Sequence, residues 1–130
     1  MARLKINQEV PSEEACKATL KAVADALYAI GGKWKLRIIV ALMDGNKRFN
    51  ELQRLIEGIS AKVLSTELKG LEINGFVRRK VFTGKPVTVE YELTAYAGTL
   101  GDVLQTLSKW GTEHREKVKR SMKKEKPVEG

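Results

Sequence analysis

The sequence has little of what builds disulfides, metal sites or membrane spans. Its 130 residues include one cysteine and one histidine, His114. One cysteine cannot form an internal disulfide, which fits a reducing cytoplasm. With no second ligand near either residue, a zinc-type site has no basis. No apolar run reaches about 18 residues and no signal-peptide pattern opens the chain, so we expect neither a membrane span nor export.

Catalytic motifs are equally scarce. The sequence contains no glycine-rich phosphate loop and no nucleophile motif. An enzyme is therefore the weaker of the hypotheses, and we expect no cofactor and no metal.

What the chain does have is positive charge. It carries 24 Lys and Arg against 16 Asp and Glu, for a net charge of +8 and a pI near 9.7. This balance favours a polyanionic partner, although many small basic proteins bind nothing acidic. The length is that of one domain with a single core.

Residues 58–93 are the most informative stretch. Leu64, Leu68 and Leu71 recur at helical spacing and predict one apolar stripe on a helix over residues 60–74. Ser60 can cap its start, and Asn74-Gly75 can end it because both residues tolerate positive φ. The opposite face holds small or basic residues and no acid: Lys62, Ser65, Thr66 and Lys69.

After this helix the period changes from helix to strand. Strand-forming residues alternate with polar ones on both sides of the turn sequence at residues 83–86, which predicts a hairpin over residues 77–93. Residues 78–85 include four basic side chains and no acidic one. Alternation places Arg78 and Lys80 on the face opposite Arg79, so not all three can touch one partner. A helix with a small basic face followed by a basic hairpin is what a winged helix presents to DNA.

Two further helices are predicted to flank this unit. Ser12 followed by two glutamates predicts a helix over residues 12–30, and Thr94 can cap a long helix over residues 95–122. Both carry apolar stripes that a small winged domain cannot cover, so a partner chain is the expected cover, although the first helix could equally serve the core. We expect residues 1–11 to form a flexible arm, residues 12–122 the single domain, and residues 123–130 a basic disordered tail.

Within the domain, the helix after Trp34 is expected to bury Val40 and Met43. A short extended piece at residues 47–49 predicts a third strand. Asn50 is expected to cap a short helix that turns Leu52, Leu55 and Ile56 inward.

Four motifs in order resemble one protein family. They are GGKWK (residues 31–35), LMDGNKRFNEL (42–52), GISAKVLSTELKGLEINGFV (58–77) and VEYELT (89–94). The chain resembles the HxlR-type winged helix-turn-helix family of prokaryotic transcriptional regulators. The resemblance implies an α+β, mainly helical winged helix-turn-helix with a small antiparallel β-hairpin wing and N- and C-terminal dimerisation helices. It also implies a cytoplasmic homodimer that binds DNA, with residues 60–74 as recognition helix and residues 83–86 as wing tip.

One departure concerns cysteine. Many members carry a Cys-Pro pair about ten residues before the GGKW motif, and in some of them this cysteine senses oxidants. Here the proline-containing pair before the motif is Val10-Pro11, about twenty residues before Gly31, and the one cysteine is Cys16, inside the predicted first helix. Cys16 is therefore a redox candidate only by analogy, and the simpler interpretation is a small buried apolar residue.

The candidate site residues form two groups. The DNA-binding candidates are Lys62, Ser65, Thr66, Lys69, Ser60, Arg48, Asn50, Lys47, Arg79, Lys85 and Thr83. The dimer-interface candidates are Leu20, Val23, Leu27, Leu100, Val103, Leu104, Leu107 and Trp110.

The predicted function is a homodimeric, sequence-specific regulator that reads a pseudo-palindromic duplex. The alternatives are a winged-helix protein-interaction module and a non-specific architectural DNA-binding module. Double-stranded RNA is disfavoured, because its deep, narrow major groove does not admit a helix. Nothing in the sequence names an effector, an operator, or the choice between repression and activation.

Overall fold

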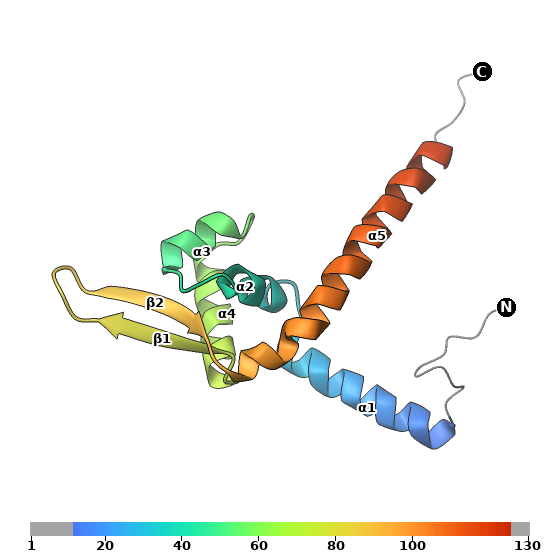
Figure 1. Ribbon diagram of the computed structural model, residues 1–130, viewed down its shortest axis with the longest axis horizontal. Coiled ribbons are helices and arrows are strands. Elements are labelled where there is room, and N and C mark those ends of the chain that lie inside the picture. The colour runs from blue at the N-terminus through green and yellow to red at the C-terminus, as the bar shows by residue number, and fades with distance from the viewer. Residues whose placement is uncertain (1–11, 126–130) are drawn as a thin grey trace.

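The computed structural model describes residues 12–125, which form one helical body with a hairpin and two projecting helices (Figure 1). The elements are α1 (Glu13–Ile30), α2 (Lys35–Leu42), α3 (Phe49–Leu55), α4 (Ala61–Ile73), β1 (Val77–Phe82), β2 (Thr88–Leu93), the 3₁₀ helix η1 (Tyr96–Leu100) and α5 (Gly101–Glu125). The predicted arm at residues 1–11 and the tail residues 126–130 lie outside the described residues. Helix α5 runs three residues past the predicted end at 122.

The core forms where α2, α3 and α4 meet the base of the hairpin. Its fully buried side chains are Ile38, Ile39, Leu52, Leu64, Leu68 and Leu71. Phe76 and Val77 join this cluster from the start of β1. The three leucines of α4 are thus the anchored stripe that the sequence predicted. Three helices and an antiparallel hairpin around one core confirm the predicted winged helix-turn-helix.

Local capping sets where the predicted helices begin and end. Ser60 Oγ accepts from the Val63 N–H at 3.1 Å, and Ser12 Oγ accepts from the Ala15 N–H at 3.1 Å, which confirms both predicted N-caps. Gly75, at φ 82°, reverses the chain after α4 and lets β1 begin two residues later.

In α2 and α3, the buried side chains are partly different from the predicted ones. Val40 (52% exposed), Met43 (55%) and Leu55 (57%) were expected to face inward but lie on the surface, whereas Ile38 and Leu42 are buried. The apolar set on α2 is wide enough to cover more than one face, and the core uses only one of them. Helix α3 also begins at Phe49, so Asn50 lies in its first turn and does not cap it.

The short piece before α3 adds a minimal third strand. The backbone of Lys47 exchanges two hydrogen bonds with Tyr91 of β2, from N to O at 3.1 Å and from O to N at 2.8 Å. Phe49, predicted to be extended, already belongs to α3. The hairpin base is therefore tied to the start of the helix-turn-helix.

Thr94 joins the hairpin to the C-terminal helix, which was predicted as one unbroken element. Its hydroxyl donates to the Gly75 carbonyl at 2.6 Å and accepts from the Ala97 N–H at 3.3 Å. Thr94 thus accepts a hydrogen bond from the first turn as a cap would, but the N-cap position is Ala95, the element that follows is a 3₁₀ turn, and α5 begins only at Gly101.

Replacing Thr94 with valine keeps the side-chain shape and removes both hydrogen bonds. We expect a loss of roughly 1–2 kcal/mol in the free energy of unfolding, because the Gly75 carbonyl and the Ala97 N–H lose their partner. Urea unfolding measures it. The matched control is Thr112→Val, whose hydroxyl bonds only to the Ser108 carbonyl of its own helix. Equal midpoints for the two variants would contradict the bridging role of Thr94.

Helices α1 and α5 leave the body and diverge from each other (Figure 1). None of the 18 residues of α1 is buried. Beyond Leu104, the described side chains of α5 are exposed apart from Ser121, which is half-buried. None of the helices within residues 12–125 is both long and apolar enough to cross a lipid bilayer.

Candidate nucleic-acid interface

The outer face of α4 is the first part of the candidate interface. Lys62, Thr66 and Lys69 follow one another at four- and three-residue spacing and are exposed, directly opposite the buried leucines. Ser65 lies at the edge of this face and is half-buried. Among residues 12–125, neither lysine of this face is in an ion pair. The face therefore offers two free ammonium groups on a rigid helix.

The hydroxyl groups of α4 are partly committed to its own backbone. Thr66 Oγ1 donates to the Lys62 carbonyl at 3.1 Å, so its proton is used while its oxygen lone pairs and its methyl group stay available. Ser60 is exposed at the helix start, with its oxygen engaged as the cap. Ser60 therefore shapes the helix end and keeps its hydroxyl proton for an acceptor outside.

An ion pair links α4 to α2 and offsets a negative charge on α4. Lys35 Nζ donates to Glu67 Oε1 at 2.7 Å, with side chains 23% and 21% exposed. The ammonium of Lys35 thereby offsets the charge of Glu67, which lies on the side of α4 and not on its exposed face. The ammonium of Lys35 is therefore engaged within the fold.

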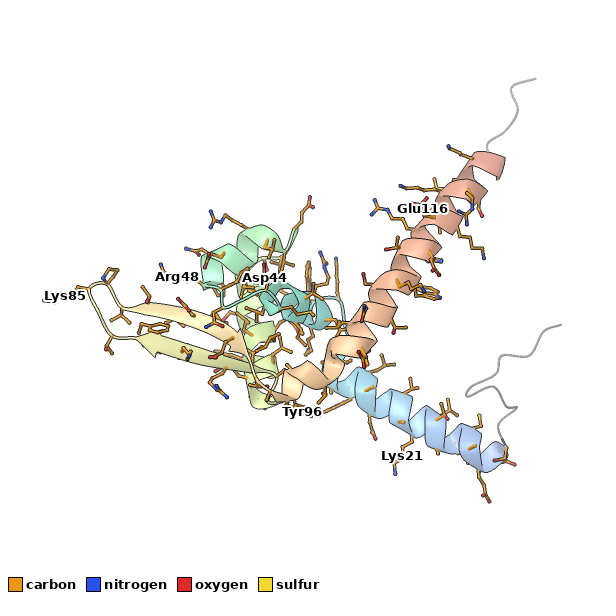
Figure 2. The ribbon with its side chains drawn as sticks, in the orientation of Figure 1. Lys21, Asp44, Arg48, Lys85, Tyr96 and Glu116 are labelled. Carbon is orange, nitrogen blue, oxygen red and sulfur yellow. The ribbon has the colours of Figure 1, made fainter. Side chains whose placement is uncertain are left out.

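The start of α3 presents Arg48 and Asn50, both exposed. Arg48 occupies the N-cap position in extended conformation, and its N–H donates to Glu51 Oε1 at 2.8 Å. Figure 2 shows Arg48 at the outer end of this helix. A helix N-terminus with an adjacent arginine suits a phosphate group electrostatically.

Lys47 is a poorer candidate than its neighbours. Its ammonium lies 2.5 Å from Asp44 Oδ1, and its side chain is 18% exposed. The hydrogen bond from Lys47 and its positive charge together hold the pKa of the Asp44 carboxyl below its usual range. The charge of Lys47 thus serves the α2–α3 loop first.

The hairpin separates its basic residues between two faces, as alternation predicted. Arg78 pairs in register with Glu92, and Arg79 with Tyr91. The guanidinium of Arg78 lies 3.9 Å from Glu92 Oε1. Lys80 Nζ lies 3.2 Å from Glu92 Oε2, without the alignment of a hydrogen bond. One carboxylate therefore offsets two cations on that face.

The remaining wing candidates stay open to solvent. Arg79, Thr83 and Lys85 are exposed, and none of the ion pairs within residues 12–125 includes Arg79 or Lys85. Lys85 lies at the far end of the hairpin (Figure 2). The wing thus carries its free charge at the tip and along one face.

The predicted dimer residues divide into core and surface. Leu104 is 6% exposed and Leu100 packs against the core. The prediction that a partner chain covers these two residues is therefore wrong, because they are covered by their own chain. Exposed apolar residues remain on both helices. They are Leu20 (65%), Val23 (50%), Leu27 (62%), Val103 (48%), Leu107 (47%) and Trp110 (60%).

Cys16 is exposed on α1, so the simpler interpretation of a residue buried in the core of its own chain is wrong. Among the residues whose side chains are described, no group of three or more His, Cys, Asp or Glu gathers in a metal-binding arrangement.

Two cations flank the ring of Trp34, an arrangement that the sequence did not predict. Lys33 Nζ lies 4.9 Å and Arg37 Cζ 4.6 Å from the ring centroid of Trp34, and Arg37 Nη2 donates to the Glu57 carbonyl at 3.4 Å. Trp34 itself is partly buried and packs against the core. The three-residue spacing from Trp34 to Arg37 on one helix was the available signal.

Comparison with known proteins gives one consistent answer. A sequence model described as HxlR-like helix-turn-helix matches residues 29–119. The uncharacterized HTH-type transcriptional regulator YybR of Bacillus subtilis is 37% identical over 106 residues, covering 82% of this chain and 81% of the relative. A second uncharacterized HTH-type transcriptional regulator, from Halalkalibacterium halodurans, is 47% identical over 90 residues, covering 68% and 80%.

Solved structures agree with the sequences. The redox regulator HypR in its reduced form superposes with a TM-score of 0.71 at 36% identity, covering 76% of this chain and 98% of HypR. The structure of a regulator named YtcD gives a TM-score of 0.69 at 41% identity, covering 72% of this chain and 96% of that one. The chain therefore belongs to the HxlR-like helix-turn-helix family of transcriptional regulators.

Proposed function

We propose that this protein is a cytoplasmic homodimer that binds double-stranded DNA and regulates transcription through a pseudo-palindromic operator. It acts by occupying the operator and catalyses no reaction. The observation that carries the proposal is the outer face of α4, where Lys62, Thr66 and Lys69 project from a helix anchored by three buried leucines. Side chains of this length and polarity suit the major groove. Lysine can donate to guanine O6 and N7, and the threonine methyl can contact a thymine methyl.

The other exposed cations fit a supporting role on the DNA backbone. Arg48 and Asn50 at the start of α3, and Arg79, Thr83 and Lys85 on the wing, lie on the two elements that flank a recognition helix in this fold. They set affinity and salt dependence, while the α4 face sets sequence preference. Lys47 contributes less, because Asp44 holds its ammonium.

The exposed apolar residues of α1 and α5 support the homodimer. A two-fold dimer presents two α4 helices to half-sites whose centres lie roughly 34–36 Å apart, or a multiple of that. Repression would follow from covering a promoter, and activation from recruiting polymerase.

Selection of bound duplexes from a random pool at physiological salt tests the proposal. We expect an inverted repeat with half-sites about one helical turn apart. Binding without any motif would support the architectural alternative, and an absence of binding to any duplex would favour a protein-docking module.

The wing gives a second, independent test. Lys85→Ala should weaken binding to all duplexes alike and lower the slope of log K against log salt by about one unit for each bound protomer, because each wing loses one phosphate contact. Titrations at four or more salt concentrations measure the slope. The charge-matched control is Lys119→Ala, on the side of α5 opposite Trp110, which should leave the slope unchanged. An unchanged slope for Lys85→Ala would remove the wing tip from the interface.

A further inference from the structure

The two faces of the hairpin carry different sets of side chains. Successive residues of a strand point to opposite faces, so Arg79 shares one face with its cross-strand partner Tyr91, and Arg78 shares the other face with Glu92. At its base the Arg79 face is continuous with the core, because Tyr91 packs against the core cluster. The Arg78 face also includes Lys80, two residues further along β1. A duplex that lies against one face therefore leaves the basic residues of the other face unused.

Glu92 lies between the two cations of the Arg78 face. Its Oε1 lies 3.9 Å from Arg78 Nη1, and its Oε2 lies 3.2 Å from Lys80 Nζ. The side chain of Glu92 is only 16% exposed, whereas those of Arg78 and Lys80 are 60% and 45% exposed. No hydrogen bond within residues 12–125 reaches Oε2, so the carboxylate acts on the cations through its charge. The cations therefore remain accessible to a polyanion, but their charge is partly offset.

The position of Lys80 shows that this offset is concentrated on one carboxylate. The residue directly opposite Lys80 in the hairpin is Glu90, yet the ammonium of Lys80 lies beside Glu92. None of the ion pairs within residues 12–125 includes Glu90. Without the charge of Glu92, this face would hold two cations and one carboxylate outside any ion pair, and it would attract DNA.

We propose that Glu92 determines which face of the wing contacts DNA. By offsetting Arg78 and Lys80, it weakens a competing docking mode in which their face lies on the phosphate backbone. Phosphate contacts carry no sequence information, so such a mode would strengthen binding to any duplex without contacts from α4. Glu92 thereby raises operator binding relative to non-specific binding. The inference rests on the DNA binding proposed above, in which Arg79 and the wing tip contact the backbone.

Glu92→Gln keeps the size of the side chain and removes its charge. The full-length protein is titrated with the selected operator and with an unrelated duplex of equal length at several salt concentrations. We expect affinity for the unrelated duplex to rise about tenfold or more, and its salt slope to steepen by about one to two units per bound protomer, because one or two further phosphates are contacted. Affinity for the operator should rise less than about threefold, because base contacts from α4 hold the wing with Arg79 toward the DNA.

Glu90→Gln is the matched control, because it removes the same charge from the same face at a residue outside the ion pairs. It should change the ratio of the two affinities by less than about twofold. Adding Arg78→Gln and Lys80→Gln to Glu92→Gln should return the affinity for the unrelated duplex to near the wild-type value. A gain that persisted in this triple variant would overturn the proposal, because the carboxylate would then repel DNA directly.

Three other results would also overturn the role of Glu92. They are unchanged non-specific affinity in Glu92→Gln, equal gains on the two duplexes, and an equal effect of Glu90→Gln. A test that does not depend on the stability of Glu92→Gln is the double variant Arg78→Gln/Lys80→Gln. Its operator affinity should stay within about threefold of the wild type, and a loss of about tenfold or more would place these cations in the operator contact. Failure of the wild type to bind any duplex would instead overturn the proposed function itself.

Discussion

The double substitution Lys62→Ala/Lys69→Ala is expected to weaken binding of each protomer to its half-site of the selected operator by roughly 30- to 1,000-fold. This range assumes about 1–2 kcal/mol for each base contact and tenfold in affinity for each 1.4 kcal/mol. Both side chains are exposed on α4, and neither is in an ion pair within residues 12–125, so the fold should lose little stability.

The diagnostic result is the difference between two kinds of duplex. Binding to the operator and to an unrelated sequence is measured by titration at the same salt concentration. If the lysines read bases, the operator loses far more affinity than the unrelated duplex. The matched control, Lys109→Ala/Lys119→Ala, removes the same charge from α5. Equal losses on the two duplexes would reassign Lys62 and Lys69 to phosphate contacts.

The single variants refine the assignment. Lys69 lies two turns into α4. Lys62 lies near the start of α4, where a phosphate of the DNA backbone would also be within its reach. We therefore expect Lys69→Ala to change sequence preference more than Lys62→Ala.

The sequence predicted the recognition helix and the wing because both are specified by local signals. The leucine spacing, the Ser60 cap and the Asn74-Gly75 end determine α4 without help from distant residues. The same holds for the hairpin, where alternation correctly placed Arg79 opposite Arg78 and Lys80. Local capping and periodicity act within a few residues, so they can be read in one dimension.

The positions that the sequence misassigned depend on tertiary placement. Val40, Met43 and Leu55 have the right character and spacing for a core, but the core was already filled from another face of the same helices. Periodicity shows which face of a helix is apolar, but it does not show which residues of that face pack into the core. Val40 and Leu55 instead line an open apolar groove between α2, α3 and α5.

The charged residues show a similar limit. Lys35, Lys47 and Lys80 resemble the free lysines of α4 in sequence, yet each lies within ion-pair distance of a carboxylate. Glu67 is 32 positions from Lys35, and no local pattern announces such a pair. The number of cations free to contact a polyanion is therefore smaller than composition suggests.

The largest effect on assembly is expected from Trp110→Glu. Trp110 is 60% exposed on α5 and stacks on His114 with ring centroids 4.9 Å apart, so the chain can lose it and still fold. A carboxylate at the centre of the exposed α5 face would be buried without a partner in the dimer, which is unfavourable by several kcal/mol. Sedimentation at micromolar concentration should show monomers, and operator affinity should fall by about 100-fold or more because the two half-sites are no longer bound by one linked unit.

Two further variants make this result specific. Thr112→Glu introduces the same charge on the opposite side of α5 and should leave the dimer intact. Leu104→Ala, by contrast, creates a cavity in the core and should reduce the free energy of unfolding by about 2–5 kcal/mol, since Leu104 is only 6% exposed.

If Trp110→Glu remained dimeric while Thr112→Glu dissociated, the interface would lie on the other face of α5. If Leu104→Ala dissociated the dimer without lowering stability, Leu104 would belong to the interface after all. The expected pattern separates the residues that build the domain from those that join two copies.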